Sequence, residues 1–224
     1  MAGSGKSGNA SLASSMTDLM TSLMVIFVLL LVATLNNASA EGENTRNLIL
    51  DQLRIDLQDF AKKGVRVEKD PADPLGLLVL VPEGLLNFAV DKSDIPKGGI
   101  EFLSVFAPRL ASTSCNSRYE KEISSIVVEG HTDSSGTDEH NLDLSQRRSL
   151  TVVQQTLNIL GRGEARDKAC FLDFLSASGR GSKEPILDGH GAEDKDRSRR
   201  VVFKIRVRSL EQREIRAILG NRNG

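Results

Sequence analysis

The chain has 224 residues, with 29 lysines and arginines, 30 aspartates and glutamates, and a formal net charge of −1 at pH 7. This balance excludes the basic surface with which proteins hold nucleic acid, so we expect no direct nucleic-acid partner. The length fits one membrane helix followed by one water-facing domain.

Residues 1–15 are rich in glycine, serine and alanine and are predicted to be a flexible N-terminus. The Gly5-Lys6-Ser7 sequence suggests a phosphate loop, but that pattern requires a further glycine five residues earlier and a preceding strand. Nucleotide binding is therefore not expected. Lys6 is the only basic residue before the apolar run, which favours a cytoplasmic N-terminus under the positive-inside rule.

Residues 16–37 are predicted to be a transmembrane helix. About 20 residues in a helix rise about 30 Å, which matches the hydrocarbon core of a bilayer. Asp18 is the one ionisable group in this segment, near its start. A carboxylate at that depth is costly and indicates a functional site. Thr21 and Ser22 lie within one helical turn of Asp18 and can share its face.

Three other interpretations of this segment stay open. Asp18 could lie in the headgroup zone, or it could serve as an N-cap. The segment could also be a signal peptide, because Ala38-Ser39-Ala40 fits the small-residue cleavage pattern. The long apolar run, the single preceding lysine and the acidic residue at its start argue against cleavage.

Residues 38–63 are predicted to be a linker and a helix. The polar residues 36–47 indicate a short linker or a fraying helix end. Ile49, Leu53 and Leu57 then form an apolar stripe with helical spacing.

Residues 64–208 alternate strand and helix patterns, and residues 209–224 are predicted to be a charged C-terminal helix or tail. Strands are predicted at 65–67, 77–81, 123–129, 171–177 and 201–207. Helices are predicted at 100–110, 141–160 and 210–219. This order indicates an α/β fold, an α+β sandwich with helices packed on one sheet.

Cys115 and Cys170 both follow the apolar segment. If this part of the chain lies in an oxidising compartment, the two cysteines are expected to form a disulfide. The alternative is a pair of buried free thiols.

The sequence DLMTSLM at residues 18–24, followed by the apolar run, resembles the membrane helix of MotB-type stator subunits. In that family the matching aspartate, here Asp18, carries the ion that drives a rotary motor. Because one span cannot line a channel, the resemblance implies a homodimer of this chain inside a ring of MotA-like multi-pass subunits. The short N-terminus and compact linker resemble ZorB-type subunits of Zorya anti-phage systems, with ZorA-like partners, more than a flagellar MotB.

The sequence GHTD at 130–133, a GxG at 179–181 and SRRV at 198–201 resemble the OmpA C-terminal-like domain. This domain is the peptidoglycan-binding module of OmpA, Pal and MotB. By matching position, the binding residues of the family fall on Asp133, Asn141, Leu144 and Arg148. Ser149 and Ser198 depart from the family pattern, which has alanine and asparagine there.

These residue types suit a diaminopimelate unit of a peptidoglycan stem peptide, which carries carboxylates and an ammonium group. Arg148 offers a planar fork for a carboxylate. Asp133 can accept from the ammonium or hold Arg148, and Asn141 is expected to open a helix whose free N–H groups favour an anion. The alternative is that Asp133 and Asn141 are caps and Arg148 is a surface ion-pair partner.

The three histidines show no close ligand spacing, so we expect no metal site. No nucleophile accompanies His131 and Asp133, and neither enzymatic activity nor a cofactor is expected.

The sequence therefore predicts a wall-anchored stator subunit of an ion-driven motor in the bacterial inner membrane, with the proton as the expected ion and a periplasmic C-terminal domain. Two alternatives stay open: a flagellar-type MotB subunit, and a structural peptidoglycan tether that transports no ion.

Overall fold

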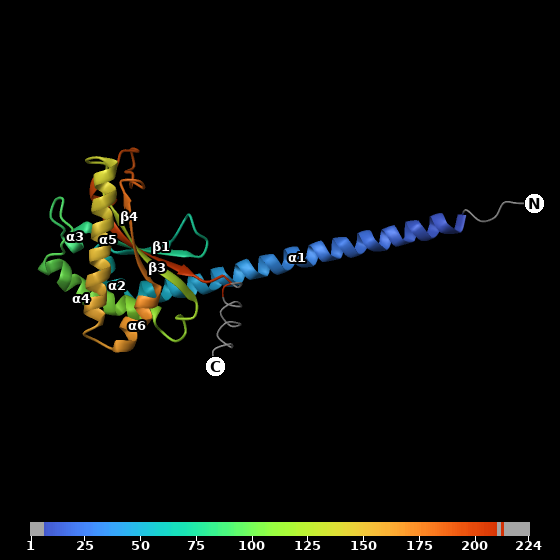
Figure 1. Ribbon diagram of the computed structural model, residues 1–224, viewed down its shortest axis with the longest axis horizontal. Coiled ribbons are helices and arrows are strands. Elements are labelled where there is room, and N and C mark those ends of the chain that lie inside the picture. The colour runs from blue at the N-terminus through green and yellow to red at the C-terminus, as the bar shows by residue number, and fades with distance from the viewer. Residues whose placement is uncertain (1–6, 210–211, 213–224) are drawn as a thin grey trace, which may run out of the picture. The chain divides into compact units, whose positions relative to one another are not determined.

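The computed structural model describes residues 7–209 and residue 212, and its ribbon is drawn in Figure 1. The chain divides into two compact units, Met1–Glu41 and Gly42–Gly224. Helix α1, Ser7–Asp56, is continuous in the backbone and belongs to both units.

In the first unit, α1 carries the apolar segment. Its side chains from 16 to 36 are all exposed. Within the described residues, this helix is the one that is long and apolar enough to cross a membrane, by length and composition. The helix begins at Ser7, inside the segment predicted to be flexible. The polar residues 36–47, where a linker or fraying end was predicted, are also helical.

The described strands of the second unit form one mixed sheet in the order β1-β2-β5-β3-β4. Their bounds are Arg66–Lys69 for β1, Gly76–Pro82 for β2, Ile123–His131 for β3, Leu175–Gly181 for β4 and Arg200–Val207 for β5. All neighbours are antiparallel except β3 and β4, which are parallel. A parallel pair needs a crossover connection, and the helices between β3 and β4 provide it.

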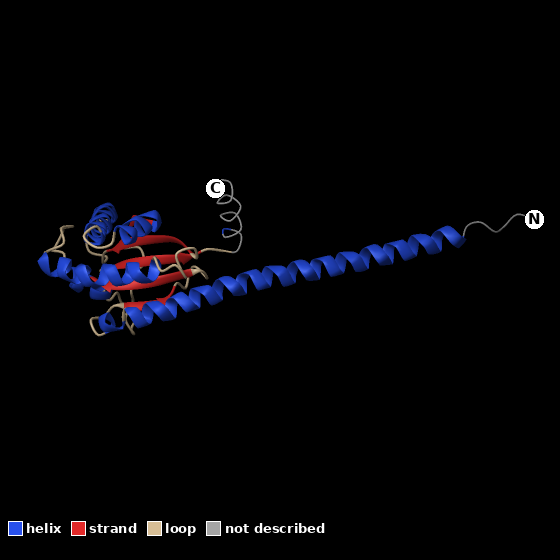
Figure 2. Cartoon of the chain, turned by 90° about the horizontal axis from the view of Figure 1, so that it is seen from below, coloured by secondary structure: helices blue, strands red, loops and turns tan. Residues whose placement is uncertain are grey.

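The second unit also contains six helices after α1 in its described part, drawn in blue in Figure 2. Their bounds are Gln58–Ala61 for α2, Glu83–Leu86 for α3, Lys97–Ser114 for α4, Asp138–Leu160 for α5, Ala165–Phe174 for α6 and Lys195–Ser198 for α7. The predicted fold class, helices on one sheet after a single apolar helix, is confirmed.

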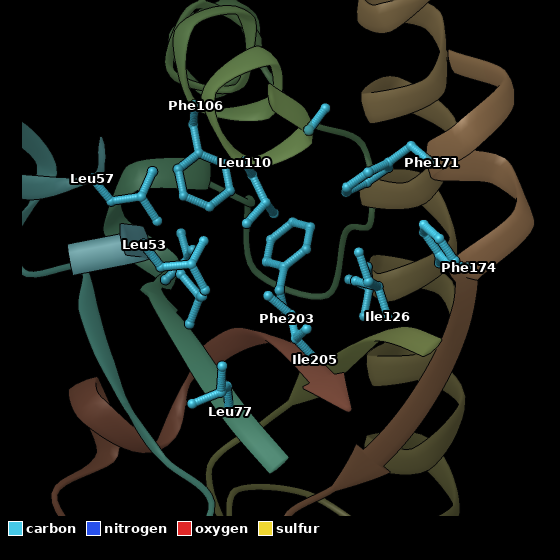
Figure 3. Close-up of a cluster of buried hydrophobic side chains, with 14 of the residues drawn as sticks. Leu53, Leu57, Leu77, Phe106, Leu110, Ile126, Phe171, Phe174, Phe203 and Ile205 are labelled. Carbon is cyan, nitrogen blue, oxygen red and sulfur yellow. The ribbon is translucent and has the colours of Figure 1, made fainter. Parts of the chain in front are cut away.

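One face of the sheet carries the hydrophobic core, and Figure 3 shows side chains from α1, α4 and α6 meeting those of the strands. Phe106 of α4 lies at the centre, with its ring 5.3 Å from that of Phe203 on β5. Because strand side chains alternate in direction, Lys204 and Glu129 face the opposite side of the sheet and are only partly buried. The core therefore fixes the helix layer on one side and leaves charged groups on the other.

Two glycines let α5 lie unusually close to the sheet. A Cβ atom at Gly130 of β3 would lie 2.3 Å from the backbone oxygen of Ser145, and one at Gly179 of β4 would lie 2.5 Å from the nitrogen of Gln146. The hydroxyl of Ser145 then accepts a hydrogen bond from the Gly181 N–H at 2.9 Å. This close approach explains the spacing of the glycine motifs and sets the position of α5.

One predicted strand differs in the structure, and one predicted helix is not described by it. The segment 171–177, predicted to be a strand, is divided between α6 and β4. Cys170, Phe171 and Phe174 are buried on one face of α6, and this helical spacing outweighs the strand preference of the aromatic residues. The predicted helix 210–219 lies almost entirely outside the described residues.

A disulfide joins Cys115, directly after α4, to Cys170 of α6, with an S–S distance of 2.06 Å. The two cysteines are 55 residues apart. In the chain-entropy model, closing a loop of this length stabilises the fold by about 4 kcal/mol. The bond ties the helix before β3 to the helix after α5.

The first prediction concerns Gly130. Replacement by alanine, Gly130→Ala, should lower the free energy of unfolding by about 1–3 kcal/mol, because the new methyl group collides with the backbone of α5. Thermal unfolding followed by circular dichroism measures the change. Gly189→Ala is the matched control, since a Cβ there meets no atom within 4 Å. Equal stability of the two variants would contradict this account of helix packing.

The second prediction concerns the disulfide. Mass spectrometry of the alkylated, non-reduced chain should find Cys115 and Cys170 in one cross-linked peptide pair. Reduction should lower the unfolding temperature, because the unfolded chain regains the entropy of the opened loop. Two alkylated thiols in protein purified without reductant would refute the pairing.

Candidate functional site

A pocket of about 1020 Å³ lies beside the N-terminal half of α5. The loop after α3 and the segment around α7 form its other walls. The four residues predicted to bind peptidoglycan all line it, and each is at most 8% exposed: Asp133, Asn141, Leu144 and Arg148. The fold thus brings the predicted binding residues together in one place.

Arg148 is held by internal contacts on three sides. Its Nε donates to the backbone oxygen of Lys92 at 3.0 Å, and one terminal nitrogen donates to Ala89 O at 3.3 Å. The other terminal nitrogen lies 2.7 Å from a carboxylate oxygen of Glu83. The guanidinium also stacks over the Phe88 ring, 4.8 Å from its centroid. Arg148 therefore reaches the pocket as an already paired group that anchors the loop after α3.

Glu83 connects this arginine to a second one. Its other carboxylate oxygen lies 3.0 Å from Nε of Arg199, whose terminal nitrogen lies 2.6 Å from Asp133. Arg199 also pairs with Asp196. One chain of charge-assisted contacts therefore runs from Arg148 through Glu83 and Arg199 to Asp133. The sequence patterns did not identify Glu83, and they pointed to Arg199 only as part of a motif.

The surroundings of Asp133 favour its charged form. Burial by itself raises the pKa of this carboxyl, but hydrogen bonds from the Ser135 backbone N–H and from Arg199 outweigh burial, so the pKa is lowered. The Ser135 N–H donates to Asp133 at 2.8 Å. The hydrogen bond to Asp133 is in turn the main reason that the pKa of Arg199 is raised. Burial lowers the pKa of Arg148, and Glu83 opposes that effect.

Helix α5 begins at Asp138, so the prediction that Asn141 opens the helix is wrong. Thr137 is the N-cap, and its side chain accepts from the His140 N–H at 3.2 Å. Asn141 lies one turn inside the helix, where its side-chain amide donates to Ser135 O at 2.9 Å. The buried asparagine therefore holds the loop that carries Asp133, and its own N–H is engaged by Thr137 O.

The pocket lining has mixed charge. It includes five arginines and four carboxylates, together with apolar side chains such as Leu144 and Phe88. Such a lining suits a ligand that carries both a carboxylate and an ammonium group.

The spacing of the histidines in the sequence did not reveal one group of possible metal ligands. Ligand atoms of Glu129, His131 and Glu184 all lie within 4.8 Å of one another. Burial and, in decreasing order, the charges of nearby Arg200, Arg180 and Lys204 together lower the pKa of His131 to about 3. The same three cations would repel a metal ion, so the group is a poor metal site.

In the first unit, two threonine hydroxyls of α1 are satisfied by the helix's own backbone. The Thr21 hydroxyl donates to Thr17 O at 2.6 Å, and the Thr34 hydroxyl donates to Leu31 O at 2.8 Å. Such bonds to the preceding turn let hydroxyls lie in an apolar helix. Asp18 has no hydrogen-bond or ion-pair partner among the described residues. Any group that neutralises this carboxylate must come from outside those residues.

Comparison with known proteins supports the sequence resemblance. The chain is 29% identical over 205 residues to the Zorya protein ZorB of Escherichia coli, covering 85% of this chain and 86% of that protein. It is 31% identical over 117 residues to the peptidoglycan-associated lipoprotein of Pseudomonas aeruginosa, covering 52% and 59% of the two chains. The predicted ZorB-like character is confirmed by the first of these matches.

A solved structure shows the same fold. It is described as a putative MotB like protein from Desulfovibrio vulgaris, with a TM-score of 0.54 and 22% identity. The match covers 76% of this chain and 99% of that one. The family model described as "OmpA family" matches residues 87–199, which include every predicted wall-binding residue and half of the chain. The chain belongs to the OmpA family.

Proposed function

We propose that this chain is a peptidoglycan-anchored, stator-like subunit of the bacterial inner membrane. The proposal rests on one observation: a pocket gathers Asp133, Asn141, Leu144 and Arg148 in a chain that also has an apolar, membrane-length helix. That helix carries one carboxylate, Asp18. The similarity to ZorB over most of both chains supports the stator-like part. The similarity to a peptidoglycan-associated lipoprotein supports the wall-binding part. No enzymatic activity is proposed.

The ligand of the pocket is the diaminopimelate unit of a stem peptide. Arg148 has five N–H donors, and its three contacts leave one donor on each terminal nitrogen for a ligand carboxylate. Asp133, kept charged by its hydrogen bonds, accepts from the ligand ammonium. Leu144 packs against the aliphatic part of the same unit. The preformed pairs hold these groups in place before the ligand arrives, which limits the ordering cost of binding.

The apolar helix carries the second half of the function. Asp18 takes up an ion, most simply a proton, and releases it on the other side of the membrane. One span cannot line a channel, so two copies of this chain stand inside a ring of MotA-like or ZorA-like multi-pass subunits. Moving one charge across the membrane yields about 2.3 kcal/mol per 100 mV, so useful work requires repeated steps. The similarity to ZorB favours a role in anti-phage defence over a flagellar one.

In this proposal, the N-terminus lies in the cytoplasm and the C-terminal domain lies in the periplasm. Lys6 before the apolar helix supports this direction. The Cys115–Cys170 disulfide supports it independently, because structural disulfides persist in the oxidising periplasm.

A second candidate function is a wall tether that transports no ion. The same pocket and the same apolar helix support it, and only the chemistry of Asp18 separates the two. A tether needs the helix to stay in the membrane, but it does not need a carboxylate there.

The third prediction tests the wall-binding pocket. Asp133→Asn should weaken sedimentation with purified sacculi at least tenfold, because it removes the charge that pairs with the ligand ammonium and with Arg199. Asp143→Asn is the matched control, since this exposed residue of α5 does not line the pocket. Both variants should keep the thermal stability of the unchanged chain to within a few degrees. Undiminished sacculus binding by Asp133→Asn would place the wall-binding surface elsewhere.

The fourth prediction tests ion transport. Asp18→Asn is nearly isosteric, so it should preserve insertion, partner assembly and wall binding, yet abolish activity because the amide cannot gain and lose charge. Phage-plating efficiency measures the activity, and co-purification of the partner subunits measures assembly. Asp51→Asn, at an exposed position further along α1, is the control and should remain active. Full protection by an assembled Asp18→Asn complex would leave the tether as the better function.

A further inference from the structure

The arginines of the pocket fall into two kinds. Arg148 and Arg199 each have a carboxylate oxygen within 3.0 Å. The other three, Arg66, Arg197 and Arg200, have no such partner. Arg66 is 3.8 Å from Glu68, Arg197 is 3.9 Å from Asp194, and no described carboxylate lies within 4.0 Å of Arg200. We call Arg66, Arg197 and Arg200 the open arginines.

The open arginines come from three different segments. Arg66 begins β1 and is paired in register with Leu80 of β2. Arg200 begins β5 on the other side of β2, paired with Pro82, and Arg197 lies in α7 directly before it. All three line the same pocket as Asp133. The fold thus places three cations from separate elements around one hollow.

The guanidinium groups of Arg66 and Arg197 are free to bind a ligand. Their side chains are 45% and 52% exposed, and neither guanidinium makes a hydrogen bond to a described residue. Arg200 is more buried, and two of its nitrogens donate to the backbone oxygens of Ser198 and Glu184 at 3.0 and 3.1 Å. Its Nε is buried without a partner. Arg200 therefore contributes positive charge more than direct contacts.

Arg200 lies near enough to Arg66 for the two charges to affect one another. Burial lowers the pKa of Arg200, the charge of Glu184 raises it, nearby Arg66 lowers it, and the charges of Glu129 and Glu68 raise it. Arg200 is also the largest charge contribution to the lowered pKa of His131. The carboxylates nearest to Arg66 and Arg197 are 3.8 and 3.9 Å away, beyond hydrogen-bond distance, so an anion that accepts hydrogen bonds from these guanidinium groups would be favourable.

We propose that the open arginines form a second subsite, which binds a carboxylate of the stem peptide other than that of the diaminopimelate unit. This inference rests on the proposed wall-binding function and extends it from one recognised residue to two. Arg66 and Arg197 donate to the carboxylate, and Arg200 supplies the charge behind them. Guanidinium groups suit this role because their planar donors match a carboxylate.

The stem peptide offers two carboxylates of this chemistry. One is the α-carboxylate of the D-glutamate that precedes diaminopimelate through its γ-carboxyl group, and the other is the terminal carboxylate of D-alanine. Neighbouring residues of an extended peptide are about 3.5 Å apart per residue, and the pocket volume of about 1020 Å³ exceeds what one side chain fills. Either carboxylate can therefore reach a subsite in the same pocket as the diaminopimelate unit.

The test is calorimetric binding of a soluble disaccharide tetrapeptide to the full chain in detergent. The double variant Arg66→Gln/Arg197→Gln should bind about tenfold more weakly than the unchanged chain and should show a smaller dependence on salt. Arg147→Gln is the matched control, because Arg147 is an exposed arginine of α5 outside the pocket lining. Both altered arginines are surface-exposed, and circular dichroism checks that the fold is retained.

Two altered ligands identify which carboxylate is bound. A tetrapeptide with an amidated D-glutamate α-carboxyl group tests the first source, and a tetrapeptide with an amidated D-alanine carboxyl group tests the second. The unchanged chain should bind the ligand that lacks the recognised carboxylate about tenfold more weakly than it binds the intact ligand. The double variant should bind both ligands equally well.

The outcomes separate this inference from the function on which it rests. If Asp133→Asn abolishes tetrapeptide binding and Arg66→Gln/Arg197→Gln binds like the unchanged chain, the second subsite is refuted and the wall-binding pocket stands. If the unchanged chain does not bind the tetrapeptide at all, both proposals fall.

Discussion

The carboxylate of Glu83 is the contact on which the pocket depends. It lies between Arg148 and Arg199, one oxygen to each, so two guanidinium groups can share a small space without repelling one another. Through Arg148 it reaches the loop after α3, and through Arg199 it reaches Asp133. Glu83 is itself placed by the end of β2, since Pro82 closes that strand and is the N-cap of α3. A single acidic side chain therefore connects the sheet, the loop and α5.

Much of this arrangement follows from local patterns in the sequence. The strands and long helices follow from apolar periodicity, and the four residues predicted to bind the wall follow from a motif that the fold concentrates around α5. Glu83 could not be found in this way, because its partners are distant in sequence and only the topology brings them together. The helix start was misjudged because Thr137, a good cap, precedes Asn141 by one turn. The aromatic residues of α6 were misjudged because strand preference and helical spacing conflict there.

The two units meet different physical demands. The apolar helix bonds its hydroxyls to its own backbone and leaves one carboxylate whose partner must be supplied from elsewhere. The pocket does the opposite, since several of its charges are paired within the chain before a ligand arrives. Its remaining cations, the open arginines, have guanidinium donors that can still bind a ligand carboxylate. A site built in this way recognises a ligand by its charge pattern as well as by its shape.

The disulfide has a mechanical consequence for a protein anchored in this way. Cys115 and Cys170 enclose β3 and α5, so Asp133, Asn141 and Arg148 all lie inside one covalent loop. Tension between the membrane helix and a ligand held at α5 must cross the sulfur–sulfur bond before it can unravel that loop. Fully stretched, the enclosed chain would measure roughly 190 Å, and the disulfide prevents this extension while it is intact. The anchor can therefore bear load as a short, stiff element even where neighbouring segments yield.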